Sequence, residues 1–131
     1  MEYVNPILEA KRYLDNAKEI LSEKASKEGN YYTDSKYVRM AGNTAWNGVL
    51  IALDSVFKIK TKSKQRISID DYKTAAAKRN KQMLTMIMSG YQTLHMAMGY
   101  DGNKAYKVCQ SGIDDAKRII DWCEKNSTAK A

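Results

Sequence analysis

The chain has 131 residues and a formal net charge of +7. This length suits one domain with a single core and is shorter than two-domain proteins usually are. One proline, seven glycines and 44% hydrophobic residues exclude collagen-like, low-complexity and disordered classes. No apolar run reaches the ~18 residues of a membrane span, so we expect no membrane partner. The start Met1-Glu2-Tyr3 lacks the features of a secretory signal, and two cysteines suit a reducing compartment, so we expect a cytoplasmic location.

The positive charge is concentrated in one part of the chain. Residues 58–82 carry nine basic and two acidic side chains, a net of +7, whereas residues 1–30, 31–57 and 83–131 carry −1, 0 and +1. A local excess of this kind creates a local field that attracts phosphate backbones, other anions or acidic proteins.

The first helix is predicted over residues 5–26. Asn5 is a good N-cap, and Pro6 at the first helical position loses no hydrogen bond. Gly29 marks the end of the segment. One apolar stripe follows the cap at alternating spacings of three and four: Ile7, Ala10, Leu14, Ala17 and Leu21.

The second helix is predicted over residues 35–58, and it is apolar on most sides. Such a helix is central and buried. Its small residues form one narrow seam, Ala41, Ala45, Gly48 and Ala52, and its large residues form another, Trp46, Leu50, Leu53 and Phe57. Gly48 costs roughly 1 kcal/mol relative to Ala in a helix interior, so we expect a neighbouring helix to pack closely there.

Two further helices are predicted over residues 69–98 and 104–125, followed by a loose tail at 126–131. Ser68 and Asp71 form a capping pattern at the start of the third helix. On the fourth, Asp114 and Asp115 are expected on the solvent side. No stretch favours a sheet, and we interpret the segment from Lys58 to Ile69 as an extended loop. Short connections between long helices predict a single all-α domain over 1–131, an antiparallel up-down four-helix bundle.

Two segments carry a resemblance to a known family. Asn5-Pro6-Ile7-Leu8-Glu9-Ala10-Lys11-Arg12-Tyr13-Leu14-Asp15-Asn16-Ala17 and Tyr32-Thr33-Asp34-Ser35-Lys36-Tyr37-Val38-Arg39-Met40-Ala41-Gly42 resemble a small helical family of unknown function from Bacteroidetes. More distantly, the helical order resembles the HEPN superfamily, whose ribonuclease members carry Arg followed five residues later by His. Here the sole histidine, His95, is preceded at that spacing by Gly90, so the resemblance implies no ribonuclease activity.

A basic run is the strongest functional signal in the sequence. Its alternate basic residues share one face of an extended ribbon, which suits a phosphate backbone, although a solvated loop has the same composition. No aromatic stacking group interrupts the run, so we expect weak sequence preference. The predicted polyanion-binding residues are Lys58, Lys60, Lys62, Lys64, Arg66, Lys78 and Lys81.

A second candidate site is an anion-binding cleft. Arg39 and Arg79 fall near apolar surface and need partners. The alternative for them is an internal ion pair with Asp15, Glu19 or Asp54. The predicted cleft residues are Tyr37, Arg39, Asn43, Trp46, Arg79, Tyr91 and His95.

The remaining reactive side chains are interpreted as structural. Cys109 and Cys123 lie about 21 Å apart along one helix, where they cannot pair and act as small hydrophobes. We therefore predict no catalytic residue, metal or cofactor. The methionines of the third helix, 83, 86, 88, 96 and 98, are assigned to the core, with part of them at a homodimer contact.

The sequence favours a small non-enzymatic binding module that contacts nucleic acid or an acidic protein through the basic run. The alternative is a HEPN-like nucleotide-binding module or enzyme that uses the cleft around Arg39, Arg79 and His95.

Overall fold

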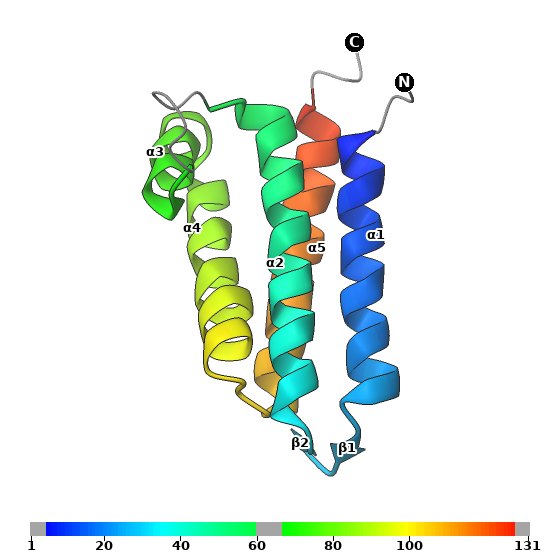
Figure 1. The fold of residues 1–131 in the computed structure, drawn as a ribbon. Coiled ribbons are helices and arrows are strands. Elements are labelled where there is room, and N and C mark those ends of the chain that lie inside the picture. The colour runs from blue at the N-terminus through cyan, green and yellow to red at the C-terminus, as the bar shows by residue number, and fades with distance from the viewer. Residues whose placement is uncertain (1–4, 60–66, 128–131) are drawn as a thin grey trace.

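The computed structural model describes residues 5–59 and 67–127, and it is an all-α structure. Its α-helices pack side by side with a short hairpin at one end (Figure 1). The helices are α1 (Pro6–Glu19), α2 (Ser35–Phe57), α3 (Ile69–Arg79), α4 (Lys81–Gly90) and α5 (Tyr106–Asn126), and two π-helical segments are η1 (Ile20–Lys24) and η2 (Tyr91–Tyr100). No helix in the described ranges is both long and apolar enough to cross a bilayer.

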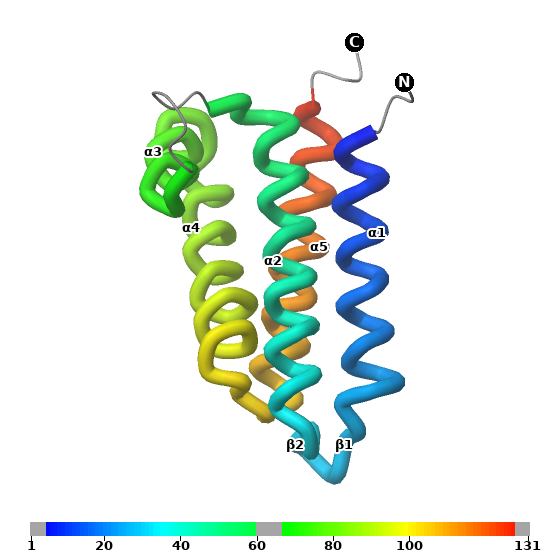
Figure 2. The backbone as a smooth tube through the Cα atoms, in the orientation of Figure 1, coloured from blue at the N-terminus to red at the C-terminus, as the bar shows by residue number. Residues whose placement is uncertain are grey.

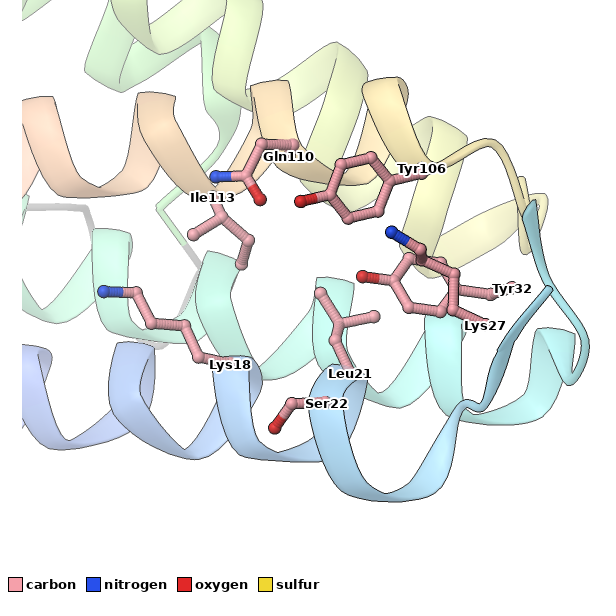
Figure 3. A pocket seen from close by; sticks show the side chains of 8 residues that line it. All are labelled: Lys18, Leu21, Ser22, Lys27, Tyr32, Tyr106, Gln110 and Ile113. Atoms are coloured by element: carbon pink, nitrogen blue, oxygen red, sulfur yellow. The ribbon is translucent and has the colours of Figure 1, made fainter. Parts of the chain in front are cut away.

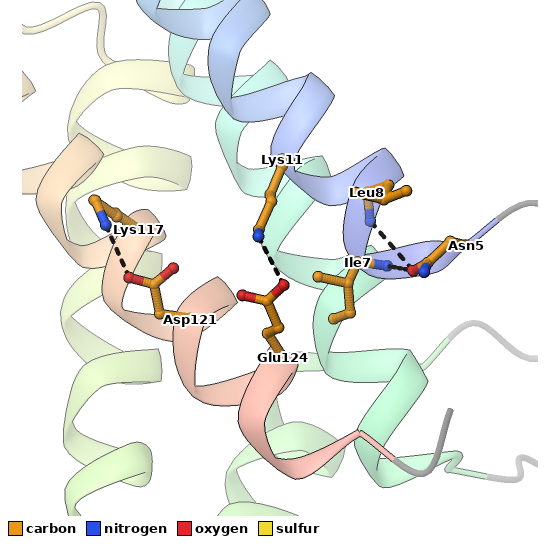
Figure 4. Close-up of polar contacts among 7 residues, drawn as sticks. All are labelled: Asn5, Ile7, Leu8, Lys11, Lys117, Asp121 and Glu124. Carbon is orange, nitrogen blue, oxygen red and sulfur yellow. Dashed lines mark hydrogen bonds and ion pairs between the residues drawn. The ribbon is translucent and has the colours of Figure 1, made fainter. Parts of the chain in front are cut away.

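The predicted start of the first helix is confirmed. The Asn5 side chain accepts hydrogen bonds from the backbone N–H groups of Ile7, at 2.9 Å, and Leu8, at 3.3 Å (Figure 4). Pro6 is the first helical residue. Farther along the chain the helix changes from α to π hydrogen bonding at Ile20. The apolar spacing predicts the helix but does not distinguish these two hydrogen-bond registers.

A two-stranded antiparallel sheet joins α1 to α2, and the expectation that no sheet would form is wrong. Strands β1 (Lys27–Glu28) and β2 (Tyr31–Tyr32) pair with Lys27 opposite Tyr32. Gly29 sits in the turn with φ +58°, a conformation that glycine adopts without the Cβ clash of other residues. The hairpin is short enough to escape detection by residue alternation.

Helix α2 has the central place that the sequence predicts. It packs against α1, α5 and η2 (Figure 2). The close approach predicted at Gly48 is confirmed, because a Cβ atom there would lie 2.9 Å from Tyr13 Cβ and 3.0 Å from the Ala10 carbonyl oxygen. Gly42 makes an even closer approach to the other neighbour, η2, where an added Cβ would lie 2.5 Å from the Leu94 carbonyl oxygen.

The predicted third helix, 69–98, is broken at Asn80. This residue is extended, with φ −162° and ψ 110°, and its side chain accepts from the backbone N–H groups of Gln82 and Met83. Its own N–H donates to the Ala76 carbonyl at 2.8 Å, so one residue ends α3 and begins α4. Asparagine is favoured at such caps because its side-chain oxygen accepts hydrogen bonds from the first backbone N–H groups of the helix, which have no partner within it.

The second half of that predicted helix, η2, is π-helical through Tyr100, two residues beyond the predicted end. Met83 and Met98 are fully buried, as expected for core residues, whereas Met88 is 45% exposed. The last helix, α5, begins at Tyr106 and ends at Asn126. The expectation that Asp115 faces solvent is wrong, because this residue is buried and accepts a 2.6 Å hydrogen bond from Ser89.

Candidate functional site

The described surface is hollowed between α2, α3 and η2. Two adjoining cavities of about 490 and 220 Å³ share their walls and together form the aromatic cavity. Helix α2 supplies one wall at helical spacing, so these side chains form a single stripe. The lining residues are Asn43, Trp46, Asn47, Leu50 and Asp54 from α2, Ile67, Ile69 and Tyr72 around α3, and Tyr91 and His95 from η2.

Three aromatic rings in the lining of this cavity contact one another. Trp46 is buried, and its ring meets the Tyr91 ring edge-on with centroids 5.7 Å apart. His95 lies 5.2 Å from Tyr91 and 6.2 Å from Trp46, tilted by 35° and 34°. The predicted cleft residues Trp46, Tyr91 and His95 are therefore in contact, and all three line the aromatic cavity.

The opposite wall is fixed by a hydrogen bond from α3. The buried Tyr72 hydroxyl donates to the Asp54 carboxylate at 2.6 Å. Burial, then this bond to Asp54, raises the pKa of Tyr72 above its ordinary value. The capping box of Ser68 and Asp71 holds the start of α3, which positions Tyr72 one turn later.

Two of the predicted cleft residues contact the end of η2. The Arg39 guanidinium Nε donates to the Tyr100 carbonyl and the Asn43 amide to the Gly99 carbonyl, both at 3.4 Å. Asn43 also lines the aromatic cavity, whereas Arg39 does not. Tyr37 is half-buried beside the Lys36 ammonium, 5.2 Å from its ring centroid, and is likewise outside the lining.

Arg79 lies apart from the aromatic cavity. Its guanidinium carbon is 5.7 Å from the ring centroid of Trp122 on α5, and Trp122 stacks on Phe57 at 5.9 Å. The structure does not bring Arg39 and Arg79 into one cleft, and within residues 5–59 and 67–127 neither forms an ion pair with Asp15, Glu19 or Asp54. The apolar stripe of a helix does not predict which neighbouring helix an arginine within that stripe will contact.

The basic run is described only at its two ends. Lys58 is the exposed C-cap of α2 in the left-handed region, with φ +49°. Lys78 and Lys81 are exposed on α3 and α4. The predicted residues Lys60, Lys62, Lys64 and Arg66 lie outside the described residues.

The cysteines are buried thiols. Burial raises the pKa of Cys109 to about 11 and that of Cys123 to about 12, which leaves both thiols protonated and poorly nucleophilic at neutral pH. Over the described ranges, no cluster of three or more His, Cys, Asp or Glu side chains is arranged to hold a metal ion.

Several cavity residues lie outside the predicted cleft. Asn47 had no predicted role, and Asp54 was expected only as an ion-pair partner. Both lie on the stripe of α2 that contains Asn43 and Trp46. Polar residues beside the large-residue seam are therefore a sequence signal for the lining of this cavity. Tyr72 and Ile67 had no such signal, because their places depend on how α3 packs across α2.

Comparisons with known proteins place the chain in a family. Residues 5–125 match the domain of unknown function DUF5618. A solved protein of unknown function from Dyadobacter fermentans is similar at 48% identity, with a TM-score of 0.86 over 92% of this chain and 94% of that chain. No protein with curated function matches. On the match over 5–125, the chain belongs to the DUF5618 family.

Proposed function

We propose that the chain is a non-enzymatic binding module, and that the aromatic cavity binds the base of a nucleotide. The observation that carries the proposal is the contact of Trp46, Tyr91 and His95 in the lining of the aromatic cavity, where Tyr91 borders the part of about 220 Å³. Ring surfaces of this kind stack with any base, because every base has a π face.

Polar groups at the rim supply base recognition. The amides of Asn43 and Asn47 and the carboxylate of Asp54 line the cavity. Amides pair with the donor and acceptor edges of a base, and a carboxylate accepts from an exocyclic amine. Arg66, a residue of the basic run, directly precedes the lining residue Ile67 in the sequence. Positive charge next to a lining residue favours a ligand that carries a phosphate.

Fluorescence tests this proposal directly. Trp122→Phe leaves Trp46 as the sole tryptophan, and titration with AMP, GMP, CMP and UMP should quench its emission. Tyr91→Leu should weaken binding by about tenfold or more, since base stacking is worth ~1–3 kcal/mol. Tyr100→Leu, on the same helix but 73% exposed and outside the cavity, should leave binding unchanged. Absence of quenching by all four nucleotides contradicts the proposal.

A second binding function rests on the charge distribution. Lys58, Lys78 and Lys81 are exposed, and within the described ranges none of them forms an ion pair. They support a polyanion contact along the basic run, with nucleic acid or an acidic protein as partner. Three to five phosphate contacts would give a log–log salt slope of roughly −3 to −4.5 on duplex DNA.

The matched test compares two triple variants with equal loss of charge. Changing Lys60, Lys62 and Lys64 together to Ser should remove most of the salt slope without changing the melting temperature. Changing the exposed Lys24, Lys104 and Lys107 to Ser should keep the slope. If the two variants behave alike, the contact is non-specific and this second function fails.

The proposal extends to the architecture and the assembly. The helical order supports an antiparallel up-down bundle of HEPN-like type, and the two free buried cysteines support a cytoplasmic location. Exposed Met88 supports a homodimer contact, which light scattering after gel filtration tests. An enzyme that uses Arg39, Arg79 and His95 has less support, because Arg79 contacts Trp122 instead.

A further inference from the structure

A second hollow, which shares no lining residue with the aromatic cavity, lies where the hairpin meets α5. We call it the tyrosine pocket; its volume is about 380 Å³. None of its residues lines the aromatic cavity, so a ligand in this pocket is independent of the proposed nucleotide site. The pocket is lined by Lys18, Leu21, Ser22, Lys27, Tyr32, Tyr106, Gln110 and Ile113 (Figure 3).

Backbone pairing builds this pocket. Lys27 and Tyr32 are opposite each other in the antiparallel hairpin, so their side chains emerge on the same side. The Tyr32 N–H donates to the Lys104 carbonyl at 2.8 Å, and the Tyr106 N–H donates to the Asn30 carbonyl at 2.9 Å. These two bonds tie the start of α5 to the hairpin and bring the two tyrosine rings to a centroid distance of 6.0 Å.

The two tyrosine hydroxyls and the Lys27 ammonium gather at one end of the pocket beside an apolar floor, and the Lys18 side chain extends toward the other end (Figure 3). Figure 3 shows the hydroxyls of Tyr32 and Tyr106 turned toward one space, above Leu21. The Lys27 ammonium is held 3.9 Å from the Tyr106 ring centroid. Among the described residues, no protein group hydrogen-bonds to either hydroxyl or pairs with Lys18. The floor residues Leu21 and Ile113 are buried.

The electrostatics of the pocket favour a negative ligand. Its lining contains two lysines and no carboxylate. It adjoins the first turn of the 21-residue helix α5, and that turn contains no acidic residue, so the helix dipole favours an anion at that end. Burial raises the pKa of Tyr32 above its ordinary value, so its hydroxyl remains a donor at neutral pH.

We propose that the tyrosine pocket binds a small organic anion, a carboxylate or a phosphate monoester with an apolar body. The anionic oxygens accept hydrogen bonds from Lys27 and the two tyrosine hydroxyls, and Lys18 adds positive charge at the other end of the pocket. The apolar body lies on Leu21 and Ile113. This arrangement provides partners for donors that lack them in the protein, and charge-assisted hydrogen bonds are the strong ones.

The test compares four probes by the shifts of backbone amide NMR signals around the pocket: hexanoate, hexyl phosphate, hexanol and inorganic phosphate. At least one of the two organic anions should bind about tenfold or more tightly than both hexanol and inorganic phosphate, and the better of the two identifies the headgroup. If neither organic anion binds, or if hexanol or inorganic phosphate binds as tightly as the better one, the proposal is overturned.

Variants assign the binding to these residues. Lys18→Gln with Lys27→Gln should weaken the better anion by about tenfold or more, whereas Lys24→Gln with Lys107→Gln, an equal loss of charge outside the lining, should change it by less than about twofold. Tyr32→Phe with Tyr106→Phe should preserve the melting temperature and weaken binding by about threefold or more. Equal affinity in the wild type and the Lys18/Lys27 variant would overturn the proposal.

Discussion

Helices α1 and η2 both pack against α2, but they do so in different ways. Helix α1 lies on a surface of small residues and approaches the α2 backbone at Gly48. The other neighbour, η2, approaches most closely at Gly42, and α4, which precedes it, packs mainly on α3 and α5. Between α2 and η2, Trp46 contacts Tyr91 and His95, and the aromatic cavity lies beside these rings. The comparison indicates that the aromatic cavity lies on the side of α2 where large side chains, rather than small residues, meet the neighbouring helix.

The largest effect is expected at Gly42, the close contact on the η2 side. Gly42→Ala places a methyl group 2.5 Å from the Leu94 carbonyl oxygen and 2.6 Å from Met98 Cβ. Neither atom is the end of a flexible side chain, so η2 must move. We expect a loss of about 3 kcal/mol in the free energy of unfolding by urea. Gly90→Ala is the control, since its nearest contact is Ile119 Cδ1 at 3.3 Å, and it should change stability by less than about 1 kcal/mol.

Gly48→Ala probes the α1 side of the same comparison. The new methyl group would lie 2.9 Å from Tyr13 Cβ and 3.0 Å from the Ala10 carbonyl oxygen. The contacts are slightly longer than at Gly42, and the gain in helix propensity offsets part of the strain. We expect destabilisation of about 1–2 kcal/mol by the same measurement. A loss as large as that of Gly42→Ala would show that the two faces of α2 are packed alike.

Tyr72→Phe tests the side of α2 that borders the aromatic cavity, because the Tyr72 hydroxyl links α3 to Asp54 on α2. We expect a loss of about 1 kcal/mol at pH 7. The folded state raises the pKa of Tyr72 above 10.0, so its contribution is complete below pH 10 and is lost as pH rises beyond it. Urea unfolding from pH 8 to 11 should therefore show a smaller alkaline loss in the variant. An identical pH dependence would contradict this role.

The smallest effect is expected where α1 meets α5 at the surface. The Lys11 ammonium lies 2.8 Å from the Glu124 carboxylate, but both side chains are at least 40% exposed (Figure 4). Exposed pairs contribute little because solvent screens them. Glu124→Gln should change the free energy of unfolding by less than about 0.5 kcal/mol. A loss above ~1 kcal/mol would mean that this ion pair, rather than small-residue packing, holds α1 in place.

The sequence was sufficient for features that depend on local periodicity. The Asn5 cap, the all-α class and the close approach at Gly48 follow from residues near one another in the chain. The break at Asn80 was missed because the apolar stripe continues across it, although an asparagine beside Arg79 and Lys81 was a usable capping signal. The π-helical register of η2 has no counterpart in the apolar spacing.

The candidate site was predictable only in part, for a related reason. Trp46, Tyr91 and His95 were placed in one cleft from their helical faces, and they are in contact. Arg79 was placed with them and contacts Trp122 instead, because the break at Asn80 changes the direction of the chain between Arg79 and Tyr91. The pairing of Lys27 with Tyr32 depends on the hairpin, and its six residues of mixed composition contain no clear strand pattern.

The break between α3 and α4 at Asn80 has a consequence for the local opening of α3. Helix α3 is an 11-residue segment with only Tyr72 and Ala76 buried, and Asn80 satisfies the ends of α3 and α4 separately. We expect such a segment to open without global unfolding, and its amides to exchange with solvent deuterium before those of α2 and α5. Since Ile69 and Tyr72 of α3 line the aromatic cavity, opening of α3 would change the size of that cavity, and amide exchange of α3 should slow when a ligand occupies it.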